Sequence, residues 1–251
     1  MDPLDFIISL AREAGTLLAD RVDGPREIAL KHRADLVTDA DRASEALIVE
    51  RIGANFPAAA ILGEEGGVYA GSGDERFIVD PLDGTTNYAH RYPLFCVSIA
   101  YERAGVLEAG AIYAPLMGEL YAARRGGEAT LNGKPIGVSS VEAVRDALVC
   151  TGFVPARFER NMANFIKLSG IAQAVRRDGS AALDIAFVAG GRFEAFWEWD
   201  LKPWDMAAGA VIVAAAGGTV SAIDGSPLDI AAGSILATNG TTHAEMRGLL
   251  S

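Results

Sequence analysis

One short segment, residues 77–88, limits the possible folds more than any other part of this 251-residue chain. Its apolar start, residues 77–79, predicts a buried strand that we expect Pro81 to end, and ligands gather at strand ends in α/β sheets. Asp80 and Asp83 offer oxygen ligands suited to Mg²⁺, and Gly84 lacks the Cβ that would keep a phosphate away from the backbone. The segment therefore predicts a metal-and-phosphate site at one strand end.

The same segment also allows an ordinary turn. Thr85, Thr86 and Asn87 are candidate caps of a following helix, whose free N–H groups would face an anion. However, an Asp-Gly pair between apolar segments also indicates a hairpin, and Asp-Pro often opens a turn. The segment alone leaves both interpretations open.

Other acids occupy similar positions at the ends of apolar runs, which favours the site. Glu64 and Glu65 follow the apolar residues 58–62, Asp205 precedes an apolar helical run, and Asp41 begins a segment with helical periodicity. Each has a simpler explanation alone: a solvated turn for the Glu pair, an N-cap for Asp205 and a helix-end acid for Asp41.

Composition excludes several classes of protein. A formal net charge of −11 and a pI near 4.8 oppose a nucleic-acid surface, and the basic clusters at 31–33, 124–125 and 176–177 are too small to reverse this. The two cysteines lie far apart, which fits reduced thiols in a cytoplasmic protein better than a disulfide framework or a thiol-rich zinc site.

No membrane association is expected. The N-terminus has helical spacing and early acids rather than the basic start of a signal peptide. The uncharged run 206–223 is rich in Ala and Gly and is broken at residues 217–218, so it predicts a buried helix followed by a strand from Thr219. With this one near residues 205–216, helices are expected near residues 3–20, 41–55, 157–175 and 181–190, and short strands and turns between about 58 and 140.

Several motifs together resemble the inositol monophosphatase family, the lithium-sensitive, Mg²⁺-dependent phosphomonoesterases. The resemblance covers nearly the whole chain in order. Its motifs are Asp35-Leu36-Val37-Thr38 with Asp41, Gly63-Glu64-Glu65, Asp80-Pro81-Leu82-Asp83-Gly84-Thr85-Thr86-Asn87-Tyr88, Leu131-Asn132-Gly133-Lys134-Pro135-Ile136, Gly179-Ser180-Ala181-Ala182-Leu183-Asp184, Trp204-Asp205-Met206-Ala207-Ala208-Gly209 and Ser234-Ile235-Leu236-Ala237-Thr238-Asn239.

The resemblance implies a layered α+β / α/β sugar-phosphatase fold. In this expectation, residues 1–143 form an N-terminal α+β part with most metal ligands. Residues 144–251 form a C-terminal α/β part with the substrate contacts and Asp205, packed on the first part as one compact unit.

The chemistry of phosphate esters favours metals over a simple acid–base site. Hydrolysis of a phosphate monoester can need a rate enhancement approaching ~10²¹, whereas one general acid or base supplies about 10² to 10⁴. The resemblance implies that one Mg²⁺ is bound by Glu64, Asp80 and the Leu82 carbonyl. A second Mg²⁺ is bound by Asp80, Asp83 and Asp205, and Glu65 assists a weaker third ion through water. Li⁺ is expected to inhibit by replacing the second Mg²⁺.

The resemblance also assigns roles in catalysis and substrate binding. Thr85, paired with Asp41, orients or deprotonates a water held at the Glu64 metal, and these three residues form the catalytic set. The N–H groups of Gly84 and Thr85 hold phosphate oxygens. The substrate's other contacts are Asp83, Gly179, Ser180, Ala181, Glu198 and Asp205. Without the resemblance, Glu198 would be explained as a salt-bridged acid between the core residues Trp197 and Trp199.

The resemblance ranks the substrates without deciding between them. It favours myo-inositol 1-phosphate. Histidinol phosphate, fructose 1,6-bisphosphate or a broader range of sugar phosphates follow, and Arg176, Arg177 and Lys202 are the evident candidates for binding a second phosphate. A non-catalytic, protein-binding regulator is the alternative of a different class, and a two-metal nuclease is disfavoured by the acidic charge. A homodimer is also expected from the family, although no pattern here identifies its interface.

Overall fold

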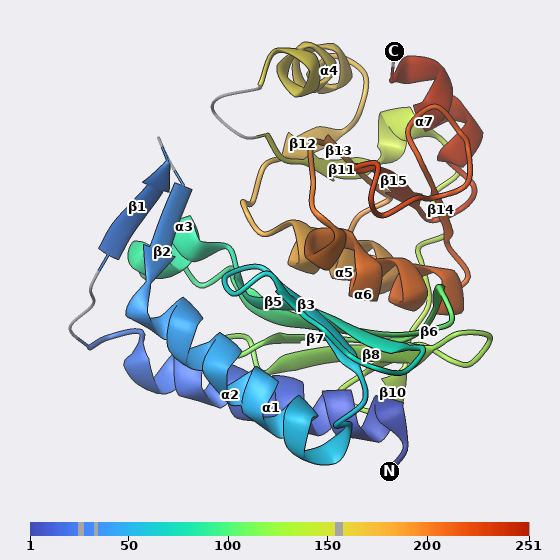
Figure 1. The fold of residues 1–251 in the computed structure, drawn as a ribbon. Coiled ribbons are helices and arrows are strands. Elements are labelled where there is room, and N and C mark those ends of the chain that lie inside the picture. Colours follow the sequence, from blue (N-terminus) through green and yellow to red (C-terminus); the bar gives the residue numbers. More distant parts are fainter. Residues whose placement is uncertain (25–27, 33–34, 154–157, 251) are drawn as a thin grey trace.

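The computed structural model of the protein describes residues 1–24, 28–32, 35–153 and 158–250. In these residues, layers of helices alternate with two large β-sheets (Figure 1). The helices, from the outer layer near the N-terminus to the layer near the C-terminus, are α1 (Pro3–Arg21) and α2 (Asp39–Asn55), then α5 (Ala181–Ala189) and α6 (Pro203–Ala215), then α4 (Glu159–Ser169) and α7 (His243–Leu249). The expected layered α+β fold is confirmed.

The larger sheet lies between the first two helical layers. Its described strands run in the order β10-β9-β8-β7-β6-β5-β3-β4 and are antiparallel except for the parallel pair β3–β5. Their bounds are β3 (Ala60–Gly63), β4 (Val68–Tyr69), β5 (Glu75–Asp83), β6 (Cys96–Arg103), β7 (Val106–Ala114), β8 (Glu119–Arg124), β9 (Thr130–Leu131) and β10 (Lys134–Pro135). Helices cover both faces, so the central strands are apolar on both sides.

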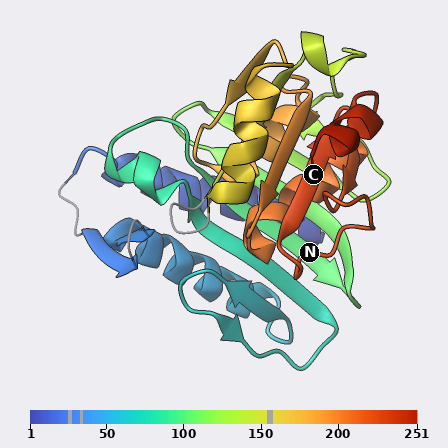
Figure 2. The same cartoon turned by 90° about the horizontal axis from the view of Figure 1, so that it is seen from above.

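The smaller sheet lies between the second and third helical layers. Its order is β12-β11-β13-β15-β14, with β12, β11 and β13 parallel and the other pairs antiparallel. The bounds are β11 (Leu148–Thr151), β12 (Ala174–Arg176), β13 (Ala195–Trp199), β14 (Thr219–Ser221) and β15 (Ser234–Thr238), after a 3₁₀ turn, η1 (Val144–Asp146). Figure 2 shows this sheet and α4 from above.

A two-stranded sheet and a short helix stand at one side of the molecule. Strands β1 (Ile28–His32) and β2 (Asp35–Thr38) form an antiparallel pair, and helix α3 (Thr85–Ala89) packs near β2 (Figure 1). The predicted basic cluster at 31–33 includes Arg33, which lies outside the described residues. The predicted helix at 157–175 likewise begins outside them.

Most helices lie where the sequence predicted them, with two corrections to the local structure. The helix predicted to reach residue 175 ends at Ser169 with Gly170 as its C-cap, and Ala174–Arg176 instead form β12 by parallel pairing with β11. Pro81 does not end its strand: β5 continues to Asp83 through a register shift between Asp80 and Asp83. A bulge tolerates proline because its residues need not donate to the ladder.

The uncharged run near residue 206 is a buried helix followed by a strand, as predicted. Helix α6 packs closely against α5: a Cβ on Gly209 would lie 2.5 Å from Cγ2 of Ile185, so only glycine fits there without a shift. Among the described residues, no helix has both the length and the apolar character needed to cross a membrane.

Candidate active site

The bulge in β5 brings several oxygen atoms together. Asp80 is 2 % exposed, and its Oδ1 accepts the Leu82 N–H at 3.0 Å, which folds the chain back at Pro81. Ser44 on α2 donates its hydroxyl to the Pro81 carbonyl at 2.8 Å. The local fold therefore holds the two carboxylates of this segment and the Leu82 carbonyl at the end of one strand.

Asp83 is held by the first turn of α5. Its Oδ2 accepts the Ser180 hydroxyl at 2.6 Å and the Ala182 N–H at 2.8 Å. The Cys96 thiol lies 3.7 Å from the same oxygen. Burial raises the pKa of Asp83, and these hydrogen bonds oppose the rise. Ser180 thus contacts the Asp83 carboxylate directly, whereas the sequence placed it only beside the substrate.

Asp205 completes the cluster from α6. The sequence suggested an N-cap, but Lys202 is the N-cap and Asp205 is the third helical residue, whose Oδ2 accepts the Lys202 N–H at 2.7 Å. Asp80, Asp83 and Asp205 each present one carboxylate oxygen, and these atoms lie within 4.8 Å of one another. The charge of Glu64 raises the pKa of both Asp80 and Asp205, so this fourth acid lies close by.

The electrostatics of the cluster suit a divalent cation. Burial raises the pKa of Asp80 well above its ordinary value, and the charges of Glu64, Asp83 and Asp205 raise it further. Burial, and then the charge of Asp83, act likewise on Asp205. Mutually repelling carboxylates are stabilised by a cation, and a donor set made only of oxygen atoms fits Mg²⁺.

Thr85 and Asp41 lie next to the cluster as a hydrogen-bonded pair. The Thr85 hydroxyl donates to Asp41 Oδ1 at 3.0 Å and lies 3.2 Å from the Leu82 carbonyl. Asp41 Oδ2 accepts the Thr38 N–H at 2.8 Å and the Thr38 hydroxyl at 2.5 Å. Asp41 is fully buried, and burial raises its pKa despite these bonds. Its orientation is therefore fixed before any ligand binds.

Gly84 shapes the turn between β5 and α3. It is the N-cap of α3, with φ of 90°, so the expectation that Thr85, Thr86 or Asn87 would cap this helix is wrong. The left-handed conformation favours glycine, and a Cβ at this position would also crowd the Leu94 carbonyl oxygen at 3.0 Å. The Asn87 side chain instead donates to the Leu94 and Asp178 carbonyls at 2.6 and 2.8 Å, which joins this turn to the loop before α5.

A cavity of about 180 Å³ lies beside the acids. Six of the expected substrate contacts line it: Asp83, Gly179, Ser180, Ala181, Glu198 and Asp205. Gly84 and Thr85 are not among its lining residues, and neither are Arg176 and Lys202, whereas Arg177 is.

Glu198 is a buried acid in the wall of this cavity. Burial raises its pKa well above the ordinary value, the charges of Asp205 and Asp83 raise it further, and the charge of Arg177 opposes them. The adjacent Trp197 and Trp199 are buried in the core, as expected of packing residues.

Sequence reasoning missed Glu45, which organises the loop that carries Glu64 and Glu65. Glu45 is 4 % exposed, and its carboxylate accepts the Glu65 N–H at 2.8 Å and the Gly66 N–H at 2.5 Å. The Tyr69 hydroxyl donates to it at 3.2 Å. Its spacing of four residues from Asp41 on a predicted helix was the available signal, because such residues share a helix face.

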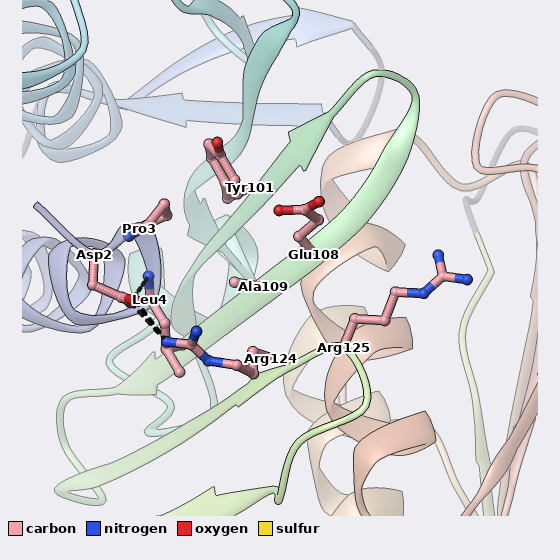
Figure 3. A pocket seen from close by; sticks show the side chains of 8 residues that line it. All are labelled: Asp2, Pro3, Leu4, Tyr101, Glu108, Ala109, Arg124 and Arg125. Atoms are coloured by element: carbon pink, nitrogen blue, oxygen red, sulfur yellow. Dashed lines mark hydrogen bonds and ion pairs between the residues drawn. The ribbon is translucent and has the colours of Figure 1, made fainter.

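A second cavity, of about 290 Å³, has different chemistry. Figure 3 shows it where the start of α1 meets β6, β7 and β8. Its lining includes two acids, Asp2 and Glu108, and Asp2 forms an ion pair with Arg124 at 2.8 Å. The predicted basic pair Arg124-Arg125 therefore supplies a surface ion pair here. The converging acids are found in the first cavity.

Comparison with known proteins agrees with the motifs. Residues 2–250 match the model of the inositol monophosphatase family. The chain belongs to this family. At the level of the family, the expected enzyme class, phosphoric monoester hydrolase, is confirmed.

Three relatives illustrate the range of the inositol monophosphatase family. An inositol-1-monophosphatase from Synechocystis is 47 % identical over 232 residues, covering 90 % of this chain and 80 % of that protein. A protein named Nus factor SuhB from Pseudomonas aeruginosa is 42 % identical, covering 94 % and 91 %. The solved structure of the extragenic suppressor protein SuhB from Bartonella henselae has a TM-score of 0.94 at 36 % identity, covering 98 % of this chain and 97 % of that one.

Proposed function

We propose that this protein hydrolyses myo-inositol 1-phosphate to inositol and phosphate in a Mg²⁺-dependent reaction. The observation that carries the proposal is the convergence of Asp80, Asp83 and Asp205 within 4.8 Å, beside the Thr85–Asp41 pair and a cavity of about 180 Å³. The inositol-1-monophosphatase from Synechocystis, 47 % identical, supports the choice of substrate.

The acids would hold two Mg²⁺ ions. Glu64, Asp80 and the Leu82 carbonyl are proposed for the first ion, and Asp80, Asp83 and Asp205 for the second. Glu65 would assist a third through water. Bound Mg²⁺ supplies positive charge that lowers the pKa of water and stabilises the phosphoryl group in the transition state. Li⁺ is proposed to compete near Asp205, and inhibition that does not depend on Mg²⁺ concentration would contradict that position.

Thr85 and Asp41 are proposed to position the attacking water. Because the Thr85 hydroxyl donates to Asp41 at 3.0 Å, its lone pairs are left to accept a proton from water. The raised pKa of buried Asp41 makes this carboxylate a better proton acceptor through Thr85. Glu64 completes the catalytic set. The N–H groups of Gly84 and Thr85 would bind phosphate oxygens.

The cavity wall would select the alcohol. Glu198, Asp83 and Ser180 offer polar atoms to ring hydroxyls, with Gly179 and Ala181 leaving room beside them. An alkyl phosphate would leave these buried polar groups without partners, at a cost of about 1–3 kcal/mol for each, so a polyol should bind better. Among the described residues that line the cavity, Arg177 is the one with a cationic side chain. This gives a substrate with a second phosphate less support than a substrate with several hydroxyls. Histidinol phosphate remains the main alternative substrate, because its amine could pair with Glu198.

Release of inorganic phosphate tests the proposal. The panel is inositol 1-phosphate, histidinol phosphate, fructose 1,6-bisphosphate and 3′-phosphoadenosine 5′-phosphate, each with Mg²⁺, EDTA or Li⁺. We expect Mg²⁺-dependent preference for inositol 1-phosphate and a loss of about 10²- to 10⁴-fold in kcat for Thr85→Ala. Thr86→Ala is the matched control, because Thr86 is the exposed neighbour. Full activity of Thr85→Ala would contradict the assigned role.

Binding to a protein partner is the second candidate function. It is favoured by the relative named Nus factor SuhB, 42 % identical over nearly all of this chain. A pull-down that recovers a stable partner such as RNA polymerase, together with negligible turnover of the panel, would favour this function over catalysis.

We also propose that the protein is a cytoplasmic homodimer. Support comes from its family and from two free, buried cysteines, which suit a reducing compartment. Sedimentation at several concentrations tests the dimer, and a single species with the mass of one chain would contradict it. Cell fractionation tests the location.

A further inference from the structure

A second group of ligating side chains lies next to the substrate cavity. Cys150, Asp178 and Asp184 each present one ligating atom, and the three atoms lie within 4.8 Å of one another. Asp184 also lines the cavity of about 180 Å³. This group shares no residue with the acid cluster at Asp80, and the proposed function gives it no role.

The fold brings these residues from three elements. Cys150 lies on β11, Asp178 follows the end of the parallel neighbour β12, and Asp184 lies in the first turn of α5. Along β11, Val149 packs in the core cluster near α7, whereas Cys150 packs in the cluster with α5. The group therefore lies at the carboxyl ends of two parallel strands, where ligands commonly bind.

Asp184 supplies an independent sign that this group binds a ligand. It is 1 % exposed, and its Oδ1 has no hydrogen-bond partner among the residues that the structure describes. A buried carboxylate oxygen without a partner is costly, and such atoms call for a missing ligand or water. Burial raises the pKa of Cys150 and of Asp184 well above their ordinary values, and the nearby charge of Asp178 raises both further. A cation that binds here must displace the thiol proton, and its charge would then offset the repulsion between the two acids.

We propose that Cys150, Asp178 and Asp184 form a site for a thiophilic divalent cation of the zinc class. A thiolate with carboxylates suits Zn²⁺ or Cd²⁺, whereas the oxygen-only cluster at Asp80 suits Mg²⁺. With Zn–S near 2.3 Å and Zn–O near 2.0–2.2 Å, donors of a tetrahedral site lie roughly 3.3–3.8 Å apart. The ligating atoms, which lie within 4.8 Å of one another, therefore need to approach by roughly 1.0–1.5 Å at most. As the cation bonds to Sγ, the thiol proton leaves to solvent.

Access to the site is available through Asp178, which is only partly buried, and through the cavity that Asp184 lines. Burial raises the pKa of Asp178 overall, and the positive charge of Arg176 partly opposes this rise. The three protein ligands leave a fourth position of the cation for water. Cation binding at these three residues does not depend on which substrate the protein hydrolyses.

Cd²⁺ titration of the full-length protein tests the site, with excess Mg²⁺ present to fill the oxygen cluster. Ultraviolet charge-transfer absorption appears only when a thiolate binds Cd²⁺. We expect it in the wild type and in Cys96→Ser, and we expect its loss in Cys150→Ser. Asp178→Asn should weaken Cd²⁺ binding at least ~10-fold, and Zn²⁺ should displace Cd²⁺.

The control uses the second buried thiol, Cys96, beside Asp83. No charge-transfer absorption in the wild type, or absorption that requires Cys96 rather than Cys150, would overturn the proposal. If Cys150→Ser does not fold, Cys96→Ser and Asp178→Asn still test the site. Unchanged Cd²⁺ affinity in Asp178→Asn would also contradict the proposal. A change of activity is not needed for either outcome.

Discussion

The buried carboxylate of Glu45 should control Mg²⁺ affinity without touching a metal or a substrate. It accepts the backbone N–H groups of Glu65 and Gly66 at 2.8 and 2.5 Å, so it fixes the loop that presents Glu64 and Glu65. A Cβ on Gly66 would lie 2.5 Å from Glu45 Oε1, so the loop wraps the carboxylate closely. Glu45→Gln keeps the shape but replaces one accepting oxygen by an NH₂ group.

The expected magnitude follows from the lost bonds. A hydrogen bond to a charged group contributes about 1.5–3 kcal/mol, and a buried N–H left unsatisfied costs about 1–3 kcal/mol. If the loop loosens to relieve this cost, rebinding of Mg²⁺ must reorder it. If about 1.4–2.8 kcal/mol of this cost is charged against Mg²⁺ binding, the affinity for Mg²⁺ becomes roughly 10- to 100-fold weaker.

Calorimetric Mg²⁺ titration measures this affinity directly, and turnover at saturating Mg²⁺ should return close to the wild-type rate. Glu50→Gln is the matched control, because Glu50 lies on the same helix with a side chain that is 71 % exposed. Wild-type Mg²⁺ affinity in Glu45→Gln, or an equal loss in Glu50→Gln, would refute the reasoning.

Three further predictions concern packing, pH and substrate binding. Gly209→Ala should lower the melting temperature, because overpacking against Ile185 costs about 1–3 kcal/mol. Gly53→Ala should raise it, because alanine favours a helix and a Cβ there meets no atom within 4 Å beyond the adjoining backbone of its own helix. Burial lowers the pKa of His243 below its ordinary value of 6.5, so this histidine binds a proton more readily in the unfolded protein than in the folded one. The free energy of unfolding should therefore fall as pH drops below about 6.5. Urea titrations at several pH values should show a smaller fall in His243→Gln. Glu198→Gln should raise KM for inositol 1-phosphate about 10-fold or more, and an unchanged KM in steady-state kinetics would remove Glu198 from the substrate site.

Local sequence signals predicted the parts of the fold that depend on near neighbours. The helices at 3–20, 41–55 and 205–216 follow from apolar periodicity, and each lies within a few residues of its predicted bounds. The exceptions have physical causes. Residues 170–175 were predicted as helix, but pairing with β11 makes Ala174–Arg176 a strand, and no local pattern reports a partner strand over twenty residues away.

The candidate site was only partly accessible to sequence reasoning. Asp80, Asp83 and Gly84 lie in one segment, so their convergence could be expected from that segment alone. The contact between Ser180 and Asp83 joins residues 97 apart in the chain, and that between Glu45 and Gly66 joins residues 21 apart. Helical spacing could place Glu45 on the same face as Asp41. It could not identify Gly66 or Ser180 as contact partners, because these contacts depend on how the layers pack.

The two explanations first weighed for the acids, helix-end residue and site residue, are compatible because a carboxylate has two oxygens. Asp205 Oδ2 accepts a backbone N–H at the start of α6, and Asp41 Oδ2 accepts one at the start of α2. Asp41 Oδ1 is left to bond Thr85. In the β5 bulge, Asp80 Oδ1 likewise accepts the Leu82 N–H. One oxygen of each of these acids accepts a backbone N–H, and these hydrogen bonds oppose the repulsion between the carboxylates. The fold can therefore keep these acids close together and oriented before a cation arrives.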